Sequence, residues 1–197
     1  RHYLSQSFPA GHRLWADADV VLAIGTRLKY QQMYWGLDKN LKILRIDIDP
    51  TEINRISTPE IGIVADARIA LQALLSALDR HNSPRTSRKQ ELTNLKTEFQ
   101  ATFEEKIAPQ MGYLRVIREE LPEDGFFVDE VTQVGFASWY AFPTYHPRHF
   151  ISAGYQGTLG YGYATALGVQ AAHPDKKVVA IAGDGGFLFN VQELATA

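Results

Sequence analysis

Six short apolar segments constrain the fold of this chain more than any other feature. In the first two, the apolar residues are continuous rather than alternating, which is typical of parallel strands covered on both faces. Helical patterns separate most of them, so the sequence predicts an α/β fold with two doubly wound parallel-sheet units. The segments are ADVVLAIG (18–25), LKILRIDID (41–49), IGIVAD (61–66), GFFVDE (125–130), RHFISAG (148–154) and KKVVAIAGDGG (176–186).

The polar segment HNSPRTSR (81–88) interrupts the hydrophobic periodicity and separates the two units. We therefore assign residues 1–82 to a first domain, 83–108 to a linker and connecting helix, and 109–197 to a second domain. Both domains are expected to be truncated, the first at its start and the second at its end. Between the last two strands, TLGYGYATALGVQAA (158–172) predicts a closely packed helix, because its side chains are mostly small.

Composition favours small-molecule chemistry. The formal net charge of −2 produces no strong field, so we expect neither nucleic acid nor a membrane surface as a partner. The absence of cysteine excludes disulfides and zinc–thiolate sites, and it is compatible with the cytoplasmic location that we expect. No apolar run approaches the roughly 20 residues that a membrane helix needs.

The glycine-rich sequence after the last predicted strand suggests a phosphate site. Gly183, Gly185 and Gly186 permit close backbone approach, and a turn leading into a helix presents N–H groups to an anion. Asp184 supplies a hard carboxylate oxygen suited to magnesium. These residue types fit a metal-bridged diphosphate. A plain Asp-Gly turn at a strand end is the alternative on local pattern alone.

The run from Val128 to Ala197, with its GTLG and GDGG motifs, resembles the pyrophosphate-binding domain of one enzyme family. This is the thiamine-diphosphate family of acetolactate synthase, pyruvate oxidase and benzoylformate decarboxylase. The upstream ADVVLAIGTRL, ILRIDIDPTEI and IVADARIAL resemble its central domain. The resemblance implies thiamine diphosphate and magnesium as cofactors and decarboxylation of a 2-oxo acid with protonation or carboligation. It also implies a homo-oligomer, because the family builds its site between subunits.

The resemblance also assigns roles to individual residues. Asp184 becomes the magnesium ligand, and Leu159 becomes the apolar prop that holds the cofactor in its bent shape. No catalytic residue is assigned, because the family's activating Glu lies in a pyrimidine-binding domain outside this chain. The remaining cofactor-binding residues are Gly183, Gly185 and Gly186 around the diphosphate, Gly157 and Thr158 beside the pyrimidine, and Thr132 and Gln133 in a loop that touches the diphosphate.

Departures from the family pattern leave the reaction open. The Asn that closes the metal motif is expected beyond Ala197, and Gly135 and Phe136 stand where synthases often have a Gln-His pair. The choice between a carboligase and a simple 2-oxo-acid decarboxylase therefore stays open. A binding or regulatory protein of the same fold, without turnover, is the alternative from another functional class.

Several polar residues have competing interpretations. Asp47 and Asp49 could hold a ribose, although capping of the next turn and helix is favoured. Some family members bind FAD on the central domain, with Arg27 and Asp66 near suitable positions; the usual glycine turn is missing, so FAD stays unproven. Glu130 could meet the cofactor or substrate, but a carboxylate at a strand end is expected to be solvated.

The histidines and tyrosines near these motifs are equally ambiguous. His146 and His149 could act as acid–base groups on a 2-oxo acid, but their loop favours surface placement. His173 is predicted to contact the last carbonyls of a helix. Packing and a subunit interface explain Tyr155, Tyr161 and Tyr163 as well as substrate contact does.

Overall fold

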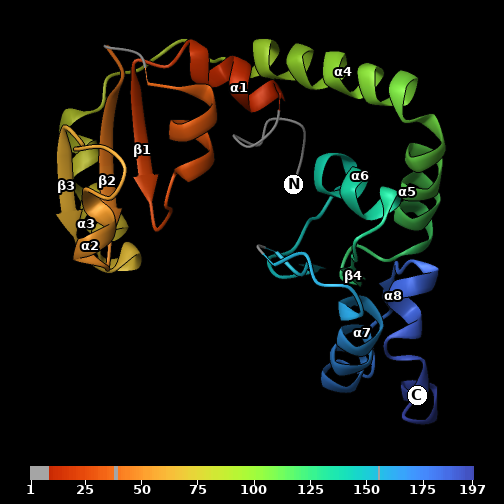
Figure 1. The fold of residues 1–197 in the computed structure, drawn as a ribbon. Coiled ribbons are helices and arrows are strands. Elements are labelled where there is room, and N and C mark those ends of the chain that lie inside the picture. The colour runs from red at the N-terminus through yellow and green to blue at the C-terminus, as the bar shows by residue number, and fades with distance from the viewer. Residues whose placement is uncertain (1–8, 38–39, 155) are drawn as a thin grey trace. The chain divides into compact units, whose positions relative to one another are not determined.

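The computed structural model describes residues 9–37, 40–154 and 156–197. They divide into two compact units, one up to Thr93 and the other from Asn94 to Ala197 (Figure 1). Each unit is built on a three-stranded parallel sheet. The α/β fold with two parallel-sheet units that the sequence predicts is thus confirmed.

The boundary between the units falls inside a long helix, α4 (Lys89–Lys106), which follows the predicted polar linker. The domain limits at residues 82 and 109 remain predictions. Within the described part of the chain, no helix is both long and apolar enough to cross a bilayer.

The sheet of the N-terminal unit has the strand order β1-β2-β3 and is parallel throughout. β2 is the central strand, and Ile43 and Ile46 on it are buried. Helices and turns connect the strands, as expected for parallel neighbours. The elements of this unit are α1 (Pro9–Ala16), β1 (Val20–Ile24), η1 (Gln31–Trp35), β2 (Lys42–Asp47), α2 (Pro50–Ile53), β3 (Ile61–Val64) and α3 (Ala67–His81).

Aspartates cap the helices that follow β2 and β3. Asp49 Oδ1 accepts a hydrogen bond from Thr51 N at 2.8 Å, and Asp66 Oδ1 accepts from Arg68 N at 3.0 Å. Such a cap satisfies a backbone donor that the first turn leaves open and contributes about 1 kcal/mol. The capping role predicted for Asp49 is confirmed, and the Asp66 carboxylate is engaged in the same way.

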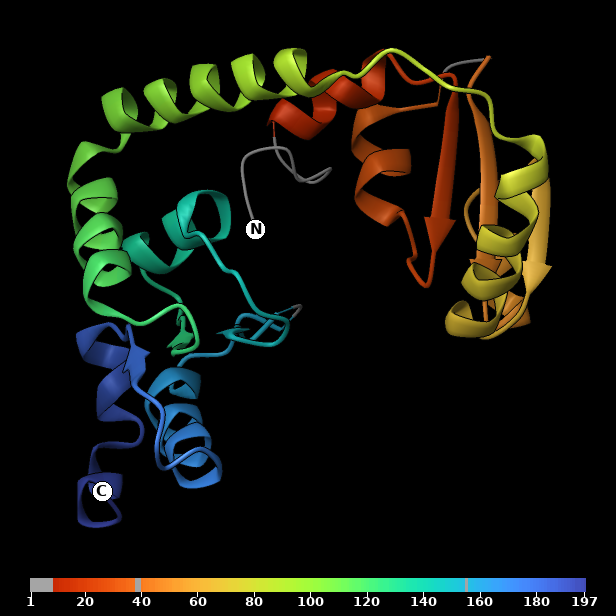
Figure 2. The same cartoon turned by 180° about the vertical axis from the view of Figure 1, so that it is seen from behind.

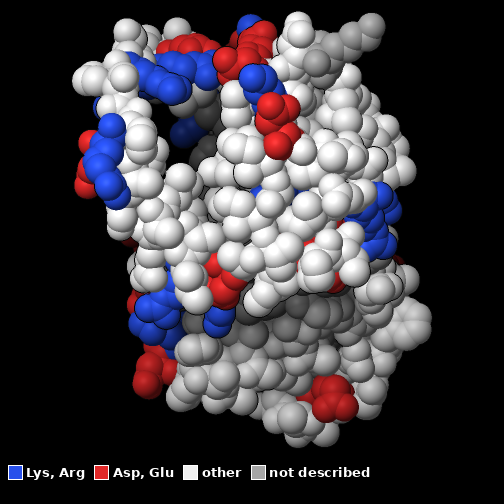
Figure 3. Space-filling model, turned by 90° about the vertical axis from the view of Figure 1, so that its left-hand side faces the viewer, with Lys and Arg blue, Asp and Glu red and all other residues white. Residues whose placement is uncertain are grey.

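An apolar surface on this unit is exposed. All four residues of β3 are exposed, and α3 has no buried residue. Ile61 is 54% exposed, and Ile69 and Leu75 on α3 are 65% and 64% exposed. Figure 3, which shows the side of the molecule where β3 and α3 lie, is largely uncharged there. The sequence predicts coverage on both faces for β1 and β2, and Val20 and Leu22 of β1 are 49% and 45% exposed, so that prediction is wrong for β1 within the described residues.

The sheet of the C-terminal unit has the strand order β5-β4-β6, again parallel. Phe127 and Val128 of the central strand are 0% exposed. Phe127 stacks on Phe142, with ring centroids 4.2 Å apart, and shares its core with Met111 and Leu114 of α5. The elements are α5 (Ala108–Glu120), β4 (Phe126–Val128), α6 (Gln133–Ala141), β5 (Phe150–Ile151), α7 (Tyr161–Ala172), β6 (Val178–Ala180), α8 (Asp184–Leu188) and η2 (Val191–Ala195).

The strand order creates a topological switch point. The chain passes from β4 to β5 on one side, then crosses to β6 on the other side of β4. Figures 1 and 2 show α6 and α7 on opposite sides of β4. In such sheets the ligand crevice lies outside the carboxyl ends of the strands where the order reverses. The fold therefore places the segments that follow β4 and β6 at one edge.

Two helices differ from the sequence prediction. The helix expected after GDGG is interrupted, because α8 spans only Asp184–Leu188 and a 3₁₀ turn, η2, follows. Within α7 only Gly162 is buried, so the close packing predicted for this small-residue helix occurs at a single position. That position faces Glu130, at the carboxyl end of β4.

We predict that Gly135→Ala destabilises the C-terminal unit by about 3 kcal/mol, because a Cβ at Gly135 would overlap the backbone oxygen of Glu130, which cannot rotate away. Gly112→Ala in α5 is the matched control. Its Cβ would meet nothing within 4 Å, so the better helix propensity of alanine should stabilise by up to about 1 kcal/mol. Urea unfolding followed by circular dichroism measures both changes. Equal stability of Gly135→Ala and the parent would contradict the packing described here.

Candidate functional site

The glycine-rich loop after β6 presents a carboxylate at its surface. Asp184 is the first residue of α8 and is exposed. Its Oδ1 accepts a hydrogen bond from Gly185 N at 2.8 Å, which fixes the side chain against its own loop. The described residues contain no group of three or more metal-ligating side chains. Magnesium commonly takes one or two carboxylates and completes its shell with phosphate oxygens and water, so a single aspartate fits this ion.

The three glycines of this loop have different surroundings. A Cβ at Gly185 would meet nothing within 4 Å, so its backbone is open to a ligand. At Gly183 the nearest atom would be the Thr132 methyl carbon, at 3.5 Å. At Gly186 a Cβ would overlap the carboxylate of Glu130. Gly186 therefore packs inward, and its predicted contact with a diphosphate stays a prediction.

The GTLG segment, residues 157–160, forms a loop that lies against the residues that follow α8. Gly157 and Gly160 have φ values of +59° and +80°, in the left-handed region that favours glycine. Asn190 Nδ2 donates a hydrogen bond to the Gly160 carbonyl, and a Cβ at Gly160 would lie 2.8 Å from Phe189 Cβ. These contacts bring together two segments about 30 residues apart in the sequence.

The residues between the two loop glycines are available to a ligand. Thr158 is exposed, and Leu159 is 50% exposed. A Cβ at Gly157 would meet nothing within 4 Å. Leucine side chains are usually buried, so a half-exposed leucine beside open backbone is suited to contact with a bound molecule.

One of the two predicted residues in the loop after β4 lies beside the glycine-rich loop. Thr132 caps α6, with Oγ1 accepting from Gly135 N at 2.8 Å, and its methyl group faces Gly183. The exposed Gln133 is directed to α5, where its Oε1 accepts from Gln110 Nε2 at 2.7 Å. The structure thus joins Thr132 to the glycine-rich loop but turns the Gln133 carboxamide toward another element.

Glu130 is the residue whose environment the sequence interpretation missed. It was expected to be solvated, yet it is 3% exposed. Its Oε1 accepts from Gly160 N at 2.7 Å, and its Oε2 accepts from Gly162 N at 2.9 Å. The sequence signal for it is the glycine before Tyr161, because a helix that begins there has no N-cap side chain to accept its first N–H groups. Asn190, which bonds the Gly160 carbonyl, was also missed.

Asp129, the residue before Glu130, is also buried and has polar and aromatic neighbours. Asp129 is 2% exposed and accepts a hydrogen bond from Trp139 Nε1. Burial raises the pKa of the Tyr161 hydroxyl, a hydrogen bond with Thr165 opposes the change, and the nearby Asp129 charge adds to it. Tyr161 is therefore neutral at physiological pH.

The neighbouring Tyr163 packs its ring against Phe187, with centroids 5.0 Å apart. Its hydroxyl is buried without a hydrogen-bond partner in the structure. The ring contact agrees with the packing role considered for Tyr163, whereas Tyr155 lies outside the described residues.

The histidines lie at the other end of the sheet. His149 and His173 both stack on Phe126, the first residue of β4, with their ring centroids 4.2 and 4.5 Å from the Phe126 ring centroid. His149 Nδ1 also lies 3.2 Å from the Gly125 carbonyl oxygen. Because Glu130 follows the carboxyl end of the same strand, these imidazoles are separated from the two glycine loops by the length of β4. The structure therefore gives them a packing role.

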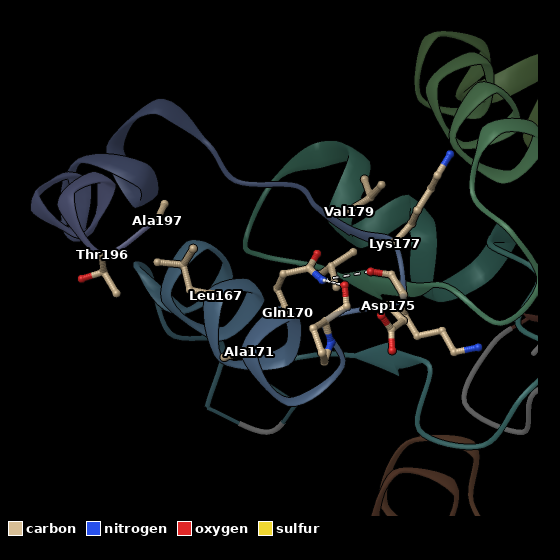
Figure 4. Close-up of a pocket in the computed structure, with 11 residues that line it drawn as sticks. Leu167, Gln170, Ala171, Asp175, Lys177, Val179, Thr196 and Ala197 are labelled. Carbon is tan, nitrogen blue, oxygen red and sulfur yellow. Dashed lines mark hydrogen bonds between the residues drawn. The ribbon is translucent and has the colours of Figure 1, made fainter.

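A pocket of about 780 Å³ also lies away from the loops (Figure 4). It is lined by the last turns of α7, the amino end of β6 and the residues Thr196 and Ala197. Gln170 Nε2 donates to three carbonyl oxygens of the turn between α7 and β6, at 3.0–3.3 Å. None of the predicted cofactor residues lines this pocket. We place the site at the glycine loops instead, because parallel sheets bind ligands at their carboxyl ends.

The chemistry of the loops fits a metal-bridged diphosphate. Open backbone at Gly157 and Gly185 allows close approach, and Asp184 offers an accessible carboxylate. Leu159 provides an apolar contact. The buried Glu130 carboxylate would oppose a second anion, but two backbone N–H groups already offset its charge.

Comparison with known proteins agrees with this geometry. Residues 3–74 match the family model described as "Thiamine pyrophosphate enzyme, central domain". Residues 130–197 match the model described as "Thiamine pyrophosphate enzyme, C-terminal TPP binding domain". The second match begins at Glu130 and contains both glycine loops.

Curated relatives cover nearly the whole chain. It is 34% identical over 192 residues to the probable 2-ketoarginine decarboxylase AruI of Pseudomonas aeruginosa, covering 95% of this chain and 34% of that protein. It is 34% identical over 197 residues to the acetolactate synthase isozyme 3 large subunit of Escherichia coli, covering 92% of this chain and 33% of that protein. The chain thus spans about a third of the length of these relatives. The chain belongs to the family of thiamine pyrophosphate enzymes.

Proposed function

We propose that this protein is an enzyme that uses thiamine diphosphate and magnesium to act on 2-oxo acids, by decarboxylation followed by protonation or carboligation. The observation that carries the proposal is that Glu130, at the carboxyl end of β4, contacts both the 157–160 loop and the glycine-rich loop that follows β6. The relative named as a 2-ketoarginine decarboxylase supports a 2-oxo acid as substrate, and those named as acetolactate synthases support carboligation.

Each loop residue has a distinct task in this proposal. Asp184 holds magnesium through a carboxylate oxygen, while the open backbone at Gly185 accommodates a diphosphate oxygen. Leu159 supports the organic part of the cofactor from one side. When bound, thiamine diphosphate supplies the electron sink for the loss of carbon dioxide. The protein then contributes binding and orientation rather than proton transfer by Asp184.

We further propose that the protein assembles as a homo-oligomer. Exposed small residues on α7, Ala164 and Gly168, would let the backbone of a second copy approach closely. Sedimentation of the complete gene product at assay concentration tests this assembly. A fully active monomer would contradict it.

Two assays of the complete gene product test the function. With thiamine diphosphate and magnesium present, it should release carbon dioxide from at least one of pyruvate, benzoylformate and 2-ketoarginine. Omission of either cofactor should abolish the release. Tight binding of the cofactor without turnover of any 2-oxo acid would instead favour a binding or regulatory protein of the same fold.

We predict that Asp184→Ala raises the Kd for thiamine diphosphate, measured by calorimetry in magnesium, by at least about 100-fold, since even indirect partners of a metal contribute 10- to 100-fold. Asp175→Ala is the matched control: this exposed aspartate lines the pocket at the opposite end of β6, and its loss should leave the Kd unchanged. Equal affinity of the Asp184 variant and the parent would remove Asp184 from the metal site.

For Leu159→Ala we predict a loss of turnover without a comparable loss of stability. Because Leu159 is half exposed, its truncation should cost less than about 1.5 kcal/mol of unfolding free energy. Misplacement of the cofactor should lower kcat by up to about 100-fold. Phe127→Ala, at a fully buried position, should instead lower stability more than turnover, with about 3–5 kcal/mol of unfolding free energy lost. Unchanged kcat per folded molecule in Leu159→Ala would show that the leucine only packs.

A further inference from the structure

Glu130 caps a helix that cannot cap itself. Gly160, the N-cap residue of α7, has no side chain to accept hydrogen bonds from the first turn. The carboxylate of Glu130, 30 residues earlier in the chain, takes that role by accepting from Gly160 N and Gly162 N. A helix start leaves such donors open, and a negative charge is favoured there. Among the residues that the structure describes, no lysine or arginine forms an ion pair with Glu130.

The same carboxylate determines where glycine is required. A Cβ at Gly162 would lie 2.7 Å from Glu130 Oε2, and one at Gly186 would overlap Oε1. Gly162 belongs to α7, whereas Gly186 belongs to the glycine-rich loop segment after β6. A single buried side chain at the end of β4 is thus in contact with both segments that form the candidate cofactor site.

We propose that Glu130 is the positioning residue of the cofactor site, which holds the 157–160 loop and the glycine-rich loop in the geometry that receives thiamine diphosphate. This inference rests on the proposed function for the identity of the ligand. The contacts themselves do not depend on it, because they exist between groups of the chain alone. Glu130 acts through Gly160, Gly162 and Gly186 and need not touch the cofactor.

The direction in which cofactor affinity changes when the Glu130 charge is removed distinguishes positioning from simple electrostatics. A carboxylate beneath a diphosphate site repels the ligand, so removal of its charge should tighten binding if charge alone mattered. Glu130→Gln removes the charge at nearly constant volume. It also directs an NH₂ group at one of the two glycine N–H donors, which leaves a buried donor without an acceptor. If positioning dominates, the glutamine variant binds the cofactor more weakly.

The first experiment compares Glu130→Gln with the parent gene product. We expect the Kd for thiamine diphosphate in magnesium, per folded molecule, to rise by about 10- to 100-fold, as expected for one unsatisfied buried donor. Amide hydrogen exchange of the cofactor-free protein should become faster at residues 157–162. Glu123→Gln, at an exposed position just before β4, is the control and should change neither quantity. Unchanged or tighter binding by Glu130→Gln would overturn the proposal.

A second experiment tests the coupling of the loops without any ligand. Gly186→Ala should strongly destabilise the parent, because the three nearest atoms to the new methyl group all belong to the Glu130 carboxylate. In the Glu130→Ala background that clash is absent, so the double variant should recover folding relative to Gly186→Ala alone. If Gly186→Ala lowers stability equally in the parent and in Glu130→Ala, the proposed contact is overturned.

The two experiments separate failure of this inference from failure of the proposed function. If the parent gene product itself binds no thiamine diphosphate, the proposed function is wrong. The comparison of Gly186→Ala in the two backgrounds then still decides whether Glu130 joins the loops. If the parent binds the cofactor and Glu130→Gln binds equally well, the function stands and the positioning role is wrong.

Discussion

The candidate site depends on one buried carboxylate. Glu130 is almost fully removed from solvent, which is costly for a charged group unless hydrogen bonds satisfy it. Two backbone N–H groups at the start of α7 do so. Because the carboxylate fills the space beside them, Gly162 and Gly186 have no room for a side chain. The arrangement of both loops thus follows from a single residue at the end of β4.

Much of the fold could be predicted from the sequence because it is encoded locally. Continuous apolar runs specify parallel strands, and the strands appear where those runs lie. Asp49 caps α2 because its side chain needs only its own neighbours. The strand order β5-β4-β6 then leads to a crevice at the carboxyl ends, where the GDGG motif follows β6. Local pattern and topology together therefore locate the site.

The remainder depends on contacts between distant residues. No local pattern shows that Glu130 is buried, since its partners are 30 and 32 residues away. Gly186 looks like a phosphate-loop glycine in the sequence, but the structure turns it toward Glu130. Gln133 likewise pairs with Gln110, 23 residues earlier. The exposure of β3 was also beyond prediction, because an apolar run specifies a strand without specifying what covers it.

The most direct test of this account is a crystal structure of the complete gene product with thiamine diphosphate and magnesium. The account predicts a diphosphate beside Gly185, magnesium on the Asp184 carboxylate, and apolar contact between Leu159 and the cofactor. It also predicts that the Glu130 carboxylate keeps its bonds to the N–H groups of Gly160 and Gly162. A diphosphate bound away from the two loops, or a Glu130 side chain that has left α7, would contradict it.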